Sequence, residues 1–154
     1  MFRPNVKDVL TGAGWFPDRT VADLLRQWEV QLALSDGFEL FAEAERALLE
    51  FGGLDVNQSG AGKTCSREPF CTDPLLAIYE GDRFREFSHY LDRRLYPIGE
   101  ACGGLCFLAI DERGRVYFLM DDLQIVGENI QEALTNLIVG IMPVRILGKY
   151  DPTR

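Results

Sequence analysis

The sequence has little of what membrane spans need. Its longest apolar runs, residues 105–110 and 116–120, have the length of β-strands, far short of the ~18 residues that cross a bilayer. The first residues contain no apolar segment of the kind found in signal peptides. We therefore expect a cytoplasmic protein that makes no contact with a membrane.

Residues for metal or nucleophilic chemistry are also scarce. There is one histidine, His89, and the four cysteines are Cys65, Cys71, Cys102 and Cys106. The cysteine spacings differ from the C-x2-C pair of common zinc sites, and in a cytosolic chain we expect reduced thiols. A cysteine nucleophile needs a histidine in contact, whereas helical periodicity places His89 on a solvent-exposed side. The sequence predicts no metal, no cofactor and no catalytic residue. An enzyme that uses Cys102 or Cys106 is the least favoured hypothesis.

An excess of basic residues is missing as well. The chain has 24 acidic and 16 basic residues and a formal net charge of −8. This balance argues against binding to nucleic acid, whose phosphates need a basic surface, and against anionic membranes. It favours a basic protein partner, because opposite charges speed encounter. The same charge balance is equally compatible with an acidic surface that only keeps the protein soluble.

One short segment resembles part of a phosphate-binding loop. Residues 60–64 read Gly-Ala-Gly-Lys-Thr, but the first glycine of the full motif would stand at position 57, which is Asn57. Pro69 disfavours a helix directly after Thr64, and the motif needs a helix N-terminus to bind phosphate. We interpret residues 60–64 as an ordinary loop.

Periodicity and turn signals predict an α+β fold. Thr20 and Asp23 have the spacing of a capping box, as have Asn129 and Glu132. Apolar residues at three- and four-residue steps indicate helices, and short apolar runs between turn residues indicate strands. The predicted helices cover residues 6–11, 20–36, 41–51, 82–95 and 130–138, and the predicted strands cover residues 54–58, 67–71, 105–110, 116–120 and 125–126. Because helices and strands are segregated, we expect one domain with a central mixed or antiparallel sheet and flanking helices.

The ends of the fourth helix and the hairpin of the last two long strands have local signals in the sequence. Asp82 is the expected N-cap of the fourth helix, and Pro97 is expected to end it. Asp111–Gly114 is expected to form a four-residue hairpin loop with Gly114 in the left-handed conformation. The strands on either side of this loop are almost continuously apolar, which indicates a sheet covered on both faces.

An ordered series of short motifs resembles the SUKH superfamily, and most of all its third subfamily, over about residues 7–140. The motifs are Ala13–Trp15, Leu49–Leu54, Arg67–Phe70, Asp73–Leu75, Leu95–Glu100, Phe107–Tyr117, Met120–Asp122 and Ile130–Leu134. The resemblance implies an α+β fold and an immunity protein of a polymorphic toxin system, which binds and neutralises a toxin domain such as a nuclease or a deaminase. It implies no active site. The glycines and proline of the shared pattern have structural roles in turns and helix ends.

The resemblance and the acidic charge together suggest an immunity protein that covers a basic active cleft of its cognate toxin. Candidate partner-binding residues, chosen by predicted exposure, are Glu80, Asp82, Glu86, Asp121 and Asp122, with Tyr117 as an aromatic anchor. Adjacent residues in a strand point to opposite faces, so Asp121 and Asp122 are not expected to share one site. The alternative is a general protein- or peptide-binding module without a toxin partner.

Overall fold

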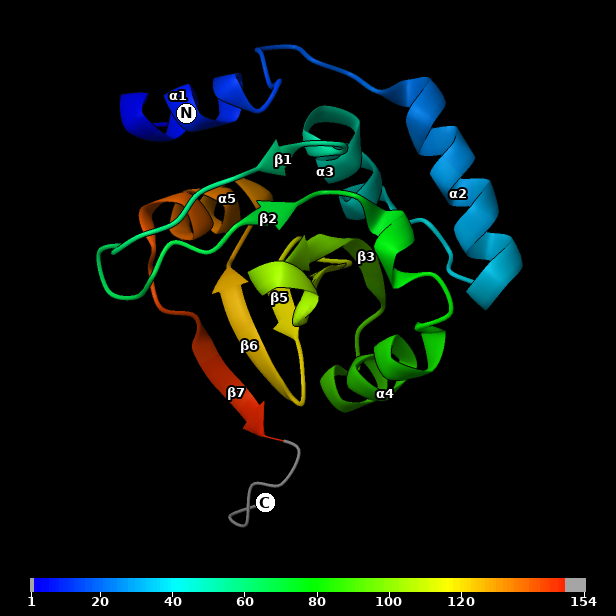
Figure 1. The fold of residues 1–154 in the computed structure, drawn as a ribbon. Coiled ribbons are helices and arrows are strands. Elements are labelled where there is room, and N and C mark those ends of the chain that lie inside the picture. Colours follow the sequence, from blue (N-terminus) through cyan, green and yellow to red (C-terminus); the bar gives the residue numbers. More distant parts are fainter. Residues whose placement is uncertain (1, 149–154) are drawn as a thin grey trace.

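The computed structural model describes residues 2–148 and contains one antiparallel sheet whose seven strands lie side by side in chain order (Figure 1). The strands are β1 Asp55–Val56, β2 Phe70–Cys71, β3 Leu95–Ala101, β4 Cys106–Asp111, β5 Val116–Leu119, β6 Asp122–Gly127 and β7 Val144–Gly148. The helices are α1 Pro4–Gly12, α2 Ala22–Asp36, α3 Ala42–Phe51, α4 Gly81–Leu91 and α5 Ile130–Val139, with short 3-10 helices η1 Pro74–Ala77 and η2 Cys102–Gly104. The predicted α+β class is confirmed, and the sheet is antiparallel throughout.

Helices cover the sheet on both faces, and side chains of β4 and β5 alternate between two cores. The larger core joins α1, α2, α3 and α5 to one face, and Phe118 of β5 belongs to it. The smaller core joins Phe84 and Phe87 of α4 to Tyr117 and Leu119 of β5 on the other face. In Figure 1, α4 accordingly lies apart from the other four helices. Burial on both faces explains the nearly continuous apolar runs of β4 and β5.

The predicted helix ends are partly confirmed. Gly37, with φ 73°, ends α2 in the left-handed conformation, and the Asn129 side chain accepts a hydrogen bond of 2.8 Å from the backbone N–H of Glu132. The capping box at Thr20 is wrong. Helix α2 begins at Ala22, after Val21, and no side chain caps it.

The predicted ends of the fourth helix are also wrong. Asp82 is not its N-cap, because α4 begins at Gly81, after Glu80, and no side chain caps it. Helix α4 ends at Leu91, where Asp92 adopts the left-handed conformation with φ 54°, and Leu95 already belongs to β3. Leu95 follows Leu91 at the four-residue spacing of a helix, so the apolar pattern continues across the break. Pro97 lies inside β3, where the ladder to β4 shifts register between Pro97 and Gly99. Such an irregularity tolerates a residue without an N–H group.

Residues 60–64 form a loop, as predicted. The backbone N–H groups of Lys63 and Thr64 donate to the carbonyls of Val139 and Gly140, at 3.0 and 2.8 Å. The residues after Thr64 lead through an isolated bridge, Ala61 to Ser66, into β2 and form no helix. The amides that would bind a phosphate are thus used to attach the loop to the end of α5.

Close backbone approach makes Gly99 a sensitive position. A Cβ atom at Gly99 would lie 2.0 Å from the carbonyl oxygen of Cys71 in β2. We expect Gly99→Ala to lower the free energy of unfolding by about 3 kcal/mol, because β2 must move away from β3. Gly12→Ala is the matched control, since a Cβ atom added at Gly12 would have no neighbour within 4 Å. Urea unfolding of both variants checks the prediction. Equal urea midpoints for Gly99→Ala and the wild type would contradict it.

Candidate partner-binding surface

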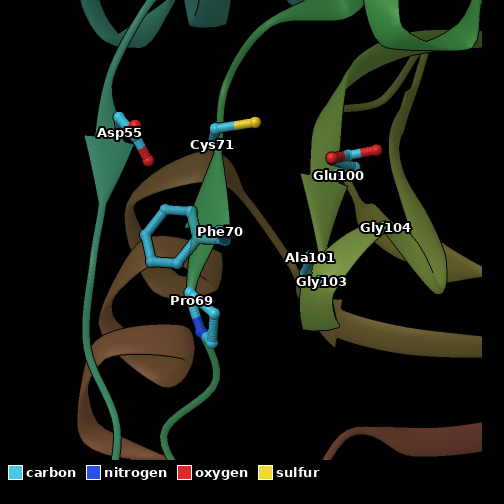
Figure 2. Close-up of a pocket in the computed structure, with 8 residues that line it drawn as sticks. All are labelled: Asp55, Pro69, Phe70, Cys71, Glu100, Ala101, Gly103 and Gly104. Carbon is cyan, nitrogen blue, oxygen red and sulfur yellow. The ribbon is translucent and has the colours of Figure 1, made fainter.

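A row of polar side chains crosses β1, β2 and β3 on the face of the sheet that carries α4. Asp55 pairs with Cys71, Cys71 with Glu100, and Glu100 with Phe107 of β4, so the four side chains point to one face. Figure 2 shows Asp55, Cys71 and Glu100 at a similar level on the three neighbouring strands. Phe107 contacts Phe84 of α4, with ring centroids 5.9 Å apart. Helix α4 therefore borders one end of the row, and the β1–β3 end lies beside two hollows.

The two adjoining hollows share Asp55 and Cys71. The first has a volume of about 120 Å³ and is drawn in Figure 2. It is lined by Asp55, Pro69, Phe70, Cys71, Glu100, Ala101, Gly103 and Gly104. The second, about 380 Å³, is lined by Leu24, Trp28, Gly53, Leu54, Asp55, Cys71 and Asp73. Together they extend from α2 across β1 and β2 to the β3–β4 connection.

The charge of both hollows is of one sign. Their charged residues are Asp55, Asp73 and Glu100, and neither hollow is lined by a lysine or an arginine among the described residues. Asp73 caps η1 by accepting from the backbone N–H of Leu75 at 3.0 Å. Within residues 2–148, neither Asp55 nor Glu100 has an ion-pair partner. The charged residues that line the hollows are therefore all acidic, and two of the three carboxylates have no ion pair among the described residues.

Exposed apolar side chains lie on the segments that line the hollows or follow these segments in the chain. Leu24 lines the second hollow and is 38% exposed, Leu76 of η1 is 42% exposed, and Leu105, which follows Gly104, is 71% exposed. Tyr79, between η1 and α4, is 81% exposed. A combination of apolar and aromatic side chains with polar groups is typical of protein interfaces. It suits a protein ligand better than a small ion.

The thiol in the row is not activated. Burial raises the pKa of Cys71, and the carboxylates of Glu100 and Asp55 raise it further, so the sulfur stays a protonated thiol at neutral pH. His89 is exposed on α4 and lines a different hollow, together with Arg85, Arg93 and other residues. Within residues 2–148, no group of three or more His, Cys, Asp or Glu side chains could hold a metal ion.

The acidic residues predicted from sequence lie in two places. Glu80 is half-buried directly before α4, and Asp82 and Glu86 are exposed on α4, on the same side of the sheet as the hollows. Asp121 is exposed and Asp122 half-buried at the turn between β5 and β6. Two of these carboxylates are paired within the chain, Asp82 with Arg85 at 2.6 Å and Asp122 with Arg145 at 3.4 Å.

The prediction of Tyr117 as an exposed anchor is wrong. Tyr117 is fully buried, and its hydroxyl donates a hydrogen bond of 2.6 Å to the Asp111 carboxylate. Its side chain belongs to the core under α4, because this sheet is covered on both faces. The exposed apolar side chains that line or directly adjoin the hollows are instead Leu24 and Leu105.

Sequence reasoning missed Asp55, Asp73 and Glu100. They are 18 to 45 residues apart in the chain, and only the pairing of β1 with β2 and of β2 with β3 brings them to one surface. Glu100 in particular belongs to β3, whose first residue, Leu95, was expected to end a helix. Near Glu100, Gly99 and Leu105 were the local sequence features that could have pointed to this surface.

The sequence model of the SUKH-3 immunity protein family matches residues 2–140. The chain belongs to the SUKH-3 immunity protein family. The match covers all described elements except β7, so the acidic hollows lie wholly within the SUKH-3 region. Comparisons with curated proteins and with solved structures found no match. No helix among the described residues is long and apolar enough to cross a membrane.

Proposed function

We propose that this SUKH-3 protein neutralises a cognate bacterial toxin by binding to the toxin domain and covering its active cleft. Membership of a family of immunity proteins is the observation that carries this proposal. The hollows beside β1, β2 and β3 support it, since all the charged residues that line them are acidic and supply a surface that a basic protein can bind. The chain acts as a cytoplasmic, non-catalytic binding protein that needs no cofactor.

The partner's active cleft is basic in this account. A toxin that cleaves or modifies nucleic acid needs positive charge around its active site to bind phosphates. Asp55, Asp73 and Glu100 take the place of those phosphates, while Leu24 and Leu105 pack against apolar groups at the rim. Complementary charge speeds encounter, and the desolvated contacts slow dissociation.

The N-terminal half of α4, with Glu80 directly before it, extends the same surface. Glu80, Asp82 and Glu86 lie on the side of the sheet that carries the hollows, and they add negative charge towards the approaching partner. Asp121 and Asp122 lie at the β5–β6 turn and are assigned to the outer rim of the contact. Charges at a rim change the association rate more than the dissociation rate.

Co-expression tests the proposal. The toxin domain encoded next to this gene is expressed from an inducible promoter, with and without this chain. We expect cells to survive induction only when the chain is present, and the two proteins to purify together. If the toxin kills equally well in both cases, the proposal is wrong for that pair, and a general protein-binding module becomes the better account.

A further inference from the structure

Three of the four cysteines line one cavity on the face of the sheet opposite the row of Asp55, Cys71 and Glu100. The cavity has a volume of about 210 Å³. Cys65 comes from the loop before β2, Cys102 from η2, and Cys106 from the start of β4. Met120 and Met142 also line it. The sulfur atoms of this cavity have no part in the proposed binding of a toxin.

Cys102 and Cys106 lie next to each other across the β3–β4 connection. Cys106 pairs with Ala101 in the ladder, and Cys102 directly follows Ala101. The buried Cys106 thiol donates a hydrogen bond of 3.6 Å to the carbonyl oxygen of Ala101, and Cys102 and Cys106 both line the cavity. Cys102 is half-buried and has φ 58°, an uncommon conformation outside glycine. The fold thus places the two cysteines beside each other in the wall of the cavity.

We propose that Cys102 and Cys106 form an oxidisable thiol pair, in which Cys102 reacts with peroxide and Cys106 resolves the product to a reversible disulfide. In the first step the Cys102 thiolate attacks hydrogen peroxide, whose O–O bond breaks, giving a sulfenic acid on Cys102 and hydroxide. In the second step the Cys106 sulfur displaces the hydroxyl group of the sulfenic acid. The Cys106 thiol proton leaves with that hydroxyl group as water. The protein loses two electrons, and the peroxide gains them.

The surroundings favour Cys102 as the reacting thiol. Cys102 is half-buried whereas Cys106 is buried, and the neighbouring Cys106 side chain lowers the pKa of Cys102 against the effect of burial, which favours the reactive thiolate. Burial raises the pKa of both Cys65 and Cys71. Cys106 is buried, and the neighbouring Cys102 side chain and burial both raise its pKa. Cys102 is therefore the one cysteine of the four whose pKa is lowered.

Peptide mapping after mild oxidation tests this pair. Trypsin cleavage after Arg94 and Arg113 releases a peptide of residues 95–113 that contains Cys102 and Cys106 and no other cysteine. Limiting hydrogen peroxide, followed by alkylation, is expected to convert this peptide to an unalkylated form lighter by two hydrogens, which dithiothreitol reverses. We expect Cys102 to oxidise at least about tenfold faster than Cys71. A disulfide between Cys65 and Cys102, or equal rates for Cys102 and Cys71, would overturn the proposal.

Variants separate the two roles. In Cys106→Ala, which keeps a small apolar side chain in the core, the sulfenic acid on Cys102 is expected to persist and to be trapped by a 1,3-diketone. Cys102→Ser is expected to abolish both the trapped adduct and the disulfide. Cys71→Ser is the matched control and should leave the oxidation of residues 95–113 unchanged. Trapping at Cys106 in Cys102→Ser protein at the wild-type rate would contradict the assigned roles.

Discussion

Glu100→Lys is expected to weaken binding of the cognate toxin domain by about a hundredfold or more. The Glu100 carboxylate lines the smaller hollow and has no ion-pair partner among the described residues. Lysine at this position both removes an attractive contact and sets like charges together, which costs several kcal/mol at an interface. Each 1.4 kcal/mol corresponds to a factor of about ten in Kd. Titration calorimetry of the purified pair measures the effect.

A matched control separates the site from net charge. Asp8→Lys changes the formal charge by the same amount at an exposed position on α1, which packs with the core on the opposite face of the sheet. We expect this variant to bind within about threefold of the wild type, because only long-range attraction is reduced. If Glu100→Lys and Asp8→Lys bind equally well, the acidic hollows are not the binding site.

Asp111→Ala is expected to cost about 3–5 kcal/mol of folding free energy, since it leaves buried polar groups without a partner. The fully buried Asp111 carboxylate accepts hydrogen bonds from Arg93 at 2.9 Å and from the Tyr117 hydroxyl at 2.6 Å. It also accepts from the backbone N–H groups of Arg113 and Arg115, at 2.8 and 3.0 Å. Urea unfolding measures the loss. Tyr117→Phe, which removes one of these donors, should cost only about 1–2 kcal/mol.

We also expect the buried Asp111 carboxylate to make the free energy of unfolding depend on pH. Burial alone would raise the pKa of Asp111, but the hydrogen bonds from Tyr117, Arg93 and the two backbone amides outweigh burial and hold it below the usual 3.8. Stability from the ionised group is thus fully present above pH 3.8 and is lost as the pH falls through the lower folded-state pKa. The difference in free energy of unfolding between wild type and Asp111→Asn should shrink as the pH falls below 3.8. A constant difference from neutral pH down to about pH 2 would contradict this linkage.

The sequence predicted the elements with strong local signals. The apolar stripes of α2 and α3, the cap at Asn129 and the hairpin between β4 and β5 were each recognisable within a window of a few turns. Gly114 has the positive φ that this hairpin requires, 98°. These features depend on residues close together in the chain, where helix and turn propensities act.

The candidate site could not be predicted in the same way. Asp55 and Glu100 are brought to one face of the sheet only by the pairing of the two-residue strands β1 and β2 with each other and with β3. Strands this short leave no periodic signal in the sequence. β3 was hidden because Leu95 continues the apolar spacing of α4. Tyr117 shows the converse problem, because a polar hydroxyl favours a prediction of exposure, whereas a buried carboxylate six positions away accepts its hydrogen bond.

Inhibition of the purified toxin domain by this chain tests the central claim most directly. The toxin encoded beside the gene is assayed on its own substrate while the chain is added in increasing amounts. We predict complete inhibition at one equivalent, with an apparent Kd that rises with salt concentration because acidic groups bind a basic cleft. Full toxin activity in the presence of a large excess of the folded chain would contradict the account.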